Sequence, residues 1–167
     1  MSTITPNQRA AHLLRVKAPA LAEAIMAEHY RQRPELERQY GPAGKLRCLE
    51  DALFHLRFLA GSVEFGDPKV FADYSAWVGE LLARRRIPVE HVAENLRVTG
   101  AVLRQALPAE AVELIGPHLD AALARLATAG DQSADHTDAV SRAGRRLNRT
   151  QVRENLPQAS EIGPLRP

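Results

Sequence analysis

The 167-residue sequence predicts an all-α domain followed by a polar C-terminal tail. Apolar residues recur at helical spacing through most of the chain, and proline and glycine stand where helices would end and begin. Strand signals are missing, because no segment alternates apolar and polar residues for long and alanine and leucine dominate over valine and isoleucine. We expect about six or seven helices from this punctuation.

The predicted domain follows an N-terminal arm, residues 1–18. Pro19 suits the first turn of a helix that runs to about residue 33, because the missing amide hydrogen of proline is harmless there. Pro34 then interrupts the chain. The Gly-Pro-Ala-Gly run at 41–44 breaks it again, and a strong helix is expected over 45–64.

The clearest junction between helices is Gly66-Asp67-Pro68. Gly66 suits the position just past a helix, Asp67 an N-cap and Pro68 the first turn of the next helix. The helix expected over 68–86 is amphipathic. Its apolar positions recur at i, i+3, i+4 and i+7, and they are Val70, Phe71, Tyr74, Trp77, Val78, Leu81 and Leu82.

Two more helices are expected over 88–105 and 108–129, each opened by a proline. The second has a predicted buried edge of Val112, Ile115, Leu119, Leu123 and Leu126. Beyond it the composition turns polar, so we predict a domain over 19–130 and a tail over 131–167. The tail is expected to hold no more than one short helix near 140–152.

Charge and cysteine content argue against several classes of protein. The chain has 22 Lys and Arg against 20 Asp and Glu, and its densest basic run, 84–86, is typical of a helix C-terminus rather than of a nucleic-acid surface. The single cysteine, Cys48, excludes an internal disulfide and CxxC-type zinc sites. No run approaches the roughly 18 apolar residues of a membrane span, and no secretory pattern opens the chain, so we expect a cytoplasmic protein without nucleic-acid or membrane partners.

The helix expected over 45–64 carries two apolar arcs, as a helical wheel shows. The first is an ordinary core stripe of Leu49, Leu53, Leu56 and Ala60, with Glu50 and Arg57 on the solvent side. The second holds Cys48, Asp51, His55 and Leu59, flanked by Phe54 and Phe58. Spacing alone favours a structural interpretation, in which Asp51 pairs with Arg47 or His55 and Cys48 is a small core residue. A buried carboxylate does, however, require a donor.

The segment from Cys48 to Phe58 resembles the chromophore-attachment helix of phycobiliproteins. In that family a cysteine is followed three residues later by aspartate, then by an aromatic pair, leucine and arginine; the matching residues here are Cys48, Asp51, Phe54-His55, Leu56 and Arg57. Weaker similarities follow in the family's order at Gly66-Asp67, Ala72-Asp73-Tyr74 and Pro117-His118-Leu119-Asp120. Together they cover about residues 20–128.

The resemblance implies a globin-like fold that holds a linear tetrapyrrole, either biliverdin or a phycobilin. It implies that Cys48 attaches this bilin through a thioether and that Asp51 accepts hydrogen bonds from its pyrrole N–H groups. Arginines and Lys45 would meet the propionates, and aromatic rings would wall the pigment. The expected chromophore-binding residues are Asp51, Arg47, Phe54, His55, Arg57, Tyr74, Trp77 and His91.

Three features separate the chain from light-harvesting members of that family. Glu50 stands where an arginine clamps a propionate, His55 replaces a tyrosine, and the N-terminal helical pair is abbreviated. The chain is therefore more similar to bilin biosynthesis-associated globins and to bilin-binding domains of bacterial photoreceptors. This implies bilin carriage, storage or light sensing. The implied partners are the bilin, a second copy of the chain, and a bilin-synthesis enzyme or signalling protein.

Two other functions fit the same order of helices. A non-haem globin-like signalling module would satisfy Cys48, Asp51 and His55 internally and bind no pigment; a bilin site would instead need a pocket of roughly several hundred Å³. A haem-binding sensor globin would use His55 or His91 as its iron ligand. An enzyme is not expected, because the chain has no nucleophile triad, phosphate loop or paired-carboxylate spacing. A thiol in an apolar pocket beside a carboxylate would also have a raised pKa.

Overall fold

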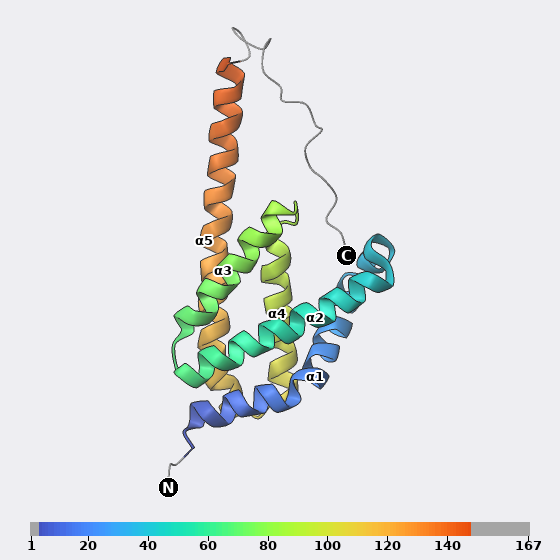
Figure 1. The fold of residues 1–167 in the computed structure, drawn as a ribbon, viewed down its shortest axis with the longest axis vertical. Coiled ribbons are helices and arrows are strands. Elements are labelled where there is room, and N and C mark those ends of the chain that lie inside the picture. The colour runs from blue at the N-terminus through green and yellow to red at the C-terminus, as the bar shows by residue number, and fades with distance from the viewer. Residues whose placement is uncertain (1–3, 148–167) are drawn as a thin grey trace, which may run out of the picture. The chain divides into compact units, whose positions relative to one another are not determined.

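In the computed structural model, which describes residues 4–147 and the side chains up to residue 130, the chain is helical throughout. Figure 1 shows the helices, which in chain order are α1 (Pro6–Gln32), α2 (Glu35–Phe65), α3 (Pro68–Arg84), α4 (Glu90–Ala106) and α5 (Ala109–Leu147). No strand occurs within 4–147, so the all-α prediction is confirmed. None of these helices combines the length and the apolar character that crossing a membrane requires.

The chain divides into two compact units, Met1–Asp131 and Gln132–Pro167. The first contains α1 to α4 and the beginning of α5. The expected end of the last helix at residue 129 is wrong, since α5 continues to Leu147. The short helix expected near 140–152 lies partly outside the described residues.

The first helix starts at Pro6 and not near Pro19. The reason is a complete capping box: the Thr5 hydroxyl accepts from the Gln8 amide at 3.1 Å, and the Gln8 side chain accepts from the Thr5 amide at 2.8 Å. Pro19 therefore lies inside α1, and the helix changes direction along its length (Figure 1). Residues expected in an arm instead enter the core, namely Ala10, Ala11 and Leu14.

The second helix bends where a break was expected. Only Gly41 leaves helical geometry, with φ 61° and ψ −161°, and Pro42 then opens the next helical stretch. Pro34 separates α1 from α2 as predicted, because it occupies the N-cap of α2. The stretches before and after Gly41 thus belong to one kinked helix rather than two separate ones.

The junction between α2 and α3 is as the sequence predicts. Gly66 has a left-handed φ of 71°, and the amides of Gly66 and Asp67 bond back to the carbonyls of Val63 and Ser62. The Asp67 side chain then accepts from the Lys69 amide at 2.9 Å and caps α3. A tight turn of this kind makes α2 and α3 neighbours that run back along each other.

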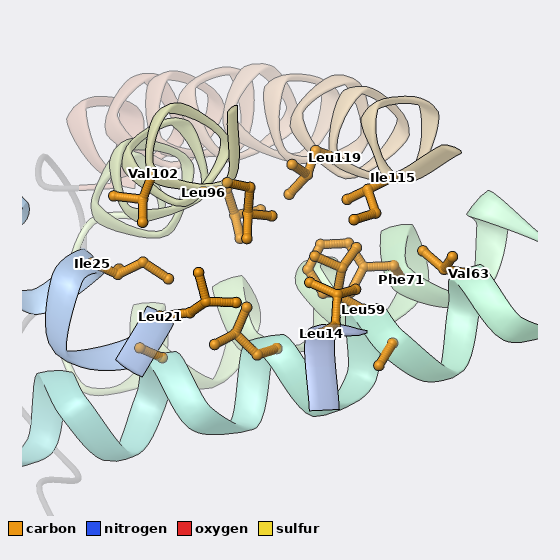
Figure 2. Packing of buried hydrophobic residues seen from close by; sticks show 14 of the residues in the cluster. Leu14, Leu21, Ile25, Leu59, Val63, Phe71, Leu96, Val102, Ile115 and Leu119 are labelled. Carbon is orange, nitrogen blue, oxygen red and sulfur yellow. The ribbon is translucent and has the colours of Figure 1, made fainter. Parts of the chain in front are cut away.

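The core of the first unit joins all five helices. Figure 2 shows side chains of α1, α2 and α3 facing those of α4 and α5; the labelled ones are Leu14, Leu21, Ile25, Leu59, Val63, Phe71, Leu96, Val102, Ile115 and Leu119. The predicted buried edge of the last helix is confirmed at Ile115, Leu119 and Leu126. Each fully buried side chain of this size stabilises the fold by roughly 1.5–3 kcal/mol.

A buried polar contact ties the α2–α3 junction to α5. The Ser62 hydroxyl donates to the Asp67 carbonyl at 2.7 Å and lies 2.6 Å from Nδ1 of His118. Both Ser62 and His118 are buried. These hydrogen bonds avoid the cost of burying unpaired polar groups. His118 of α5 thereby helps to hold the α2–α3 turn through Ser62.

Helix α3 packs through its small residues rather than through its largest ones. Phe71 is buried, but the rest of its inner face consists of Ala72, Ser75, Ala76 and Gly79. At Gly79 the approach is so close that a Cβ atom would come within 2.7 Å of Val89 Cγ2. Trp77, by contrast, is 57% exposed. The amphipathic pattern thus predicts the helix correctly, while its aromatic positions lie mostly outside the core.

Candidate functional site

The orientation of α2 exposes two phenylalanines. Its buried face is centred between the two arcs predicted from the sequence and consists of Ala52, His55, Leu56, Leu59, Ala60, Ser62 and Val63. Leu53, expected in the core, is 36% exposed, because α2 is rotated so that the second arc shares the buried side. Phe54 is consequently 52% exposed, and Phe58 is exposed beside it. Glu50 and Arg57 face solvent as predicted.

Three exposed aromatic side chains and one half-buried tyrosine lie on adjacent parts of α2 and α3, and we call them the aromatic surface: Phe54, Phe58, Trp77 and Tyr74. The Phe58 ring stacks on the Tyr74 ring with a centroid separation of 3.9 Å and an interplanar angle of 11°. The Trp77 centroid lies 6.2 Å from that of Tyr74. Phe54 lies one turn before Phe58 on the same helix face. A cluster of exposed apolar side chains of this kind is a candidate binding surface for a ligand or a partner.

A hydrogen bond next to this surface holds Tyr74 in place. Nδ1 of His55 lies 2.9 Å from the Tyr74 hydroxyl. Burial lowers the pKa of His55 to about 4, so its imidazole is neutral at neutral pH. Burial, together with the negative charge of Asp51, raises the pKa of Tyr74. His55 is therefore a supporting residue in the core, while Tyr74 connects it to the aromatic surface.

Cys48 and Asp51 lie one helical turn apart at the border of this surface. Cys48 is partly buried, and burial followed by the charge of Asp51 raises the pKa of its thiol to about 11. The pKa of Asp51 is raised by desolvation and by neighbouring Glu50, whereas Arg47 and Arg85 lower it. Asp51 is exposed as a residue, but neighbouring atoms partly desolvate its carboxyl group.

The Asp51 carboxylate has no partner among the residues that the structure describes. No described side chain or amide donates a hydrogen bond to it, and no described cation lies within ion-pair distance. Pairing with His55, one structural alternative, does not form because His55 bonds to Tyr74. Pairing with Arg47 does not form either, although its charge acts on Asp51. Because Asp51 is exposed, its carboxylate remains open to solvent or to a bound donor.

The cations near the site differ from those expected. Lys45 is not free to reach a ligand, because its ammonium pairs with Glu37 at 2.6 Å and lies over the Tyr30 ring. Arg57 lies 5.8 Å from the centroid of the Phe54 ring and remains beside the aromatic surface. Arg85 was missed in the sequence, where the basic run was assigned to the helix dipole. Arg85 follows the α2–α3 turn by about as many residues as Asp51 precedes it. In a helical hairpin such equal spacing indicates that two residues lie near each other.

His91 lies in a different group of residues. It is partly buried at the start of α4 and lies near His29 on α1, whose pKa is lowered mainly by burial and raised in part by Glu94. Glu94 of the same group pairs with Arg33 at 2.6 Å. No described hydrogen bond or ion pair links His91 to the Asp51 side of the molecule. Among the side chains up to residue 130, no three His, Cys, Asp or Glu residues are placed to hold a metal.

Two hollows in the first unit lie away from Cys48. The larger, of about 420 Å³, is bordered by α1 and α4 residues that include Ala24, Ala27 and Ala101. The smaller, of about 120 Å³, lies between the start of α1 and the start of α5. Neither is lined by Cys48, Asp51 or the aromatic surface, so neither of these two hollows supplies the pocket of several hundred Å³ that a bilin site is expected to need.

A scan against protein-family models and a search of curated proteins each found no match.

Proposed function

We propose that the chain binds a linear tetrapyrrole, biliverdin or a phycobilin, on the face formed by Cys48, Asp51 and the aromatic surface. The observation that carries this proposal is the Asp51 carboxylate, which is partly desolvated beside exposed rings and has no donor in the described structure. A partly desolvated carboxylate can accept charge-assisted hydrogen bonds from a ligand with N–H groups. The pyrrole N–H groups of a bilin meet that need, because they converge on one side of a flat apolar ring system.

The residues around Asp51 suit the rest of such a ligand. Exposed Phe54 and Trp77 offer apolar area that a conjugated ligand would cover. Arg47 and Arg57 are exposed and supply guanidinium groups for carboxylate side chains. The likeness of Cys48–Phe58 to the phycobiliprotein attachment helix supports the same ligand, and a globin-like arrangement of the helices belongs to the proposal. When bound, the bilin supplies visible-light absorption.

Cys48 is the candidate attachment residue. In the covalent step its S–H adds across a vinyl or ethylidene double bond, with sulfur bonding to one carbon and the proton to the other, so that a thioether forms. The thiol pKa of about 11 leaves little thiolate at neutral pH. Attachment is therefore slow compared with non-covalent binding, and the bilin first associates through Asp51 and the aromatic rings.

The proposed role is bilin carriage, storage or light sensing. An open face allows a ligand to be received and handed on, which suits carriage between a bilin-synthesis enzyme and a user of the pigment. A signalling partner or a second copy of this chain would cover the same face in a light sensor. Bound-state absorption before and after illumination separates the roles, since only a sensor shows a reversible spectral change.

Titration of the full chain with biliverdin tests the proposal directly. We expect the long-wavelength absorption band to sharpen and shift to the red as a one-to-one complex forms. Asp51→Asn removes the acceptor charge, so it should weaken binding or shift the band to the blue. Asp120→Asn, at an exposed carboxylate on α5, is the matched control and should bind like wild type. An unchanged biliverdin spectrum with wild-type protein contradicts the proposal.

A second measurement decides whether attachment is covalent. After incubation with the bilin, the protein is run on a denaturing gel and soaked in zinc, which makes a bound bilin fluoresce. Fluorescence that persists in wild type and disappears in Cys48→Ala assigns the thioether to Cys48. Absence of fluorescence in both, with an intact absorption band in solution, assigns a non-covalent complex.

A pigment-free interaction module is the second candidate, favoured by the openness of the aromatic surface. Exposed tryptophan is typical of residues that dominate protein–protein binding, and Trp77 is more than half exposed. In this case biliverdin leaves the spectrum unchanged, while Trp77→Ala abolishes association with a partner. Haemin titrated in parallel tests the haem-binding alternative, because a sharp Soret band would favour iron ligation.

A further inference from the structure

We propose that the outer face of α2 is a self-complementary surface through which two copies of this chain pair, with their α2 helices antiparallel. The surface, which we call the α2 seam, runs along the solvent side of the helix and consists of Leu46, Glu50, Leu53, Phe54, Arg57 and Gly61. It borders the aromatic surface at Phe54. Pairing through this seam requires no pigment.

The α2 seam carries apolar side chains that have no cover within the described structure. Leu46 near its start is 58% exposed, and Leu53 and Phe54 at its middle are exposed as well. Phe65, which ends α2, is 87% exposed. The opposite side of the same helix is buried and contacts α1 and α3. An exposed apolar stripe on a helix that is otherwise packed is typical of an interaction surface.

Two opposite charges flank the middle of the seam at equal distances. Glu50 precedes Leu53 by three residues, and Arg57 follows Phe54 by three. Neither forms an ion pair among the residues with described side chains. They cannot pair with each other either, because seven residues of helix separate them by about 10 Å. The Arg57 guanidinium lies 5.8 Å from the centroid of the Phe54 ring, towards the middle of the seam.

A two-fold axis between Leu53 and Phe54 makes this pattern complementary to itself. When two α2 helices lie antiparallel about that axis, each Glu50 faces Arg57 of the other copy, and each Leu53 faces Phe54 of the other copy. A two-fold interface repeats every contact, so both ion pairs form together. The order of charges therefore favours a second copy as the partner and specifies how the two helices align.

Gly61 supports the same alignment. A Cβ atom at this position would meet nothing within 4 Å, so packing within one copy does not require a glycine there. Glycine also weakens the interior of a helix. About the same axis Gly61 faces the exposed Leu46 of the other copy, whose side chain can then pack directly on the backbone. A glycine with no role inside the fold is thus explained by the close approach of a second helix.

The test follows the association of the full chain, without pigment, by sedimentation velocity at increasing protein concentration. Wild type should pass reversibly from monomer to dimer, because one helix from each copy forms an interface at the small end of the usual range. Glu50→Arg and Arg57→Glu should each weaken the dimer at least about tenfold, since each change replaces two attractive pairs with two repulsive ones. Glu80→Arg on α3 and Arg97→Glu on α4 are the matched controls at exposed positions and should dimerise like wild type.

Combining the two charge reversals tests the alignment itself. The double variant Glu50→Arg/Arg57→Glu should recover the wild-type dimer, because every facing pair is again of opposite charge. An equimolar mixture of the two single variants should form a heterodimer that is tighter than either homodimer, for the same reason. A double variant that associates no better than the single ones overturns the proposed alignment.

Gly61→Gln separates pairing from folding. Its side chain enters open space in the monomer, so the thermal midpoint of dilute protein should rise, while the dimer should weaken because the larger residue meets Leu46 of the other copy. A wild type that stays monomeric at every concentration overturns the proposal. So does a dimer that the charge reversals and Gly61→Gln leave intact. Neither outcome bears on biliverdin binding, which the absorption titration measures separately.

Discussion

Nδ1 of His55 lies 2.9 Å from the hydroxyl oxygen of Tyr74, and this bond joins the buried face of α2 to the half-buried Tyr74 of α3. The Tyr74 ring also stacks on Phe58. One side of Tyr74 is thus fixed by a polar contact in the core, and its ring forms part of the aromatic surface. Changes at this pair should therefore affect both stability and ligand binding.

Tyr74→Phe should lower the free energy of unfolding by about 1 kcal/mol, because the buried imidazole loses its hydrogen-bond partner. Urea denaturation followed by circular dichroism measures the change. Tyr40→Phe is the control, since Tyr40 is exposed and accepts only from neighbouring Gln39. Equal stability of the two variants would show that the His55–Tyr74 bond contributes nothing.

Stability should fall as the pH drops from about 6.5 towards 4. Burial lowers the pKa of His55 to about 4, and burial also lowers the pKa values of His29 and His118. In this window the unfolded chain binds protons that the folded chain does not, so stability is complete above pH 6.5 and is lost on acidification. Each such histidine contributes a slope of up to about 1.4 kcal/mol per pH unit.

Urea midpoints measured between pH 4.5 and 7.5 check this dependence. His55→Gln should flatten the slope, whereas His12→Gln, at an exposed position, should leave it unchanged. A stability that stays constant over the whole interval would contradict the neutral state of the buried imidazoles.

The Cys48 thiol should react slowly with Ellman's reagent at pH 8. A pKa raised to about 11 leaves far less thiolate than an ordinary cysteine has, and we expect labelling at least about tenfold slower than in the urea-unfolded chain. Asp51→Asn removes a charge that opposes the thiolate, so labelling should accelerate severalfold. Asp120→Asn serves again as the control. If Asp51→Asn labels at the wild-type rate, the charge of Asp51 does not act on the thiol.

Two glycine-to-alanine substitutions inside helices should have opposite effects. A Cβ at Gly61 meets no atom within 4 Å, so Gly61→Ala should stabilise the fold by roughly 0.5–1 kcal/mol through helix propensity. A Cβ at Gly79 would lie 2.7 Å from Val89 and 3.2 Å from Leu126, so Gly79→Ala should destabilise it by roughly 1–3 kcal/mol. Thermal melts of both variants measure these changes in stability. Stabilisation by Gly79→Ala would show that α3 is packed more loosely than its small residues indicate.

Local chemistry made some elements predictable and others not. The Gly66-Asp67-Pro68 junction follows from backbone preferences that act within a few residues, and it is confirmed. The start of α1 is set by an equally local signal, the capping box of Thr5 and Gln8, and not by Pro19. The kink at Gly41 shows the limit of such signals, because a breaker motif does not specify whether a helix ends or bends.

The orientation of each helix depended on tertiary packing. A helix with two apolar arcs does not reveal which arc faces the core, so Leu53 was misplaced and Phe58 came to lie outside. Cys48, Asp51 and Phe54 share a helix, and their relation could be derived from spacing. Tyr74 is joined to them through the hairpin, and Arg85 could be found only by counting residues on both sides of the turn.

Helix α3 uses different residues for packing against the core and for its exposed surface. Ala72, Ala76 and Gly79 keep α3 in place, while Trp77 stands exposed on its other side. Natural selection can therefore vary the outward residues without rebuilding the interior. Related sequences should accordingly keep a small residue at position 79, whereas the packing of α3 places no such limit on position 77.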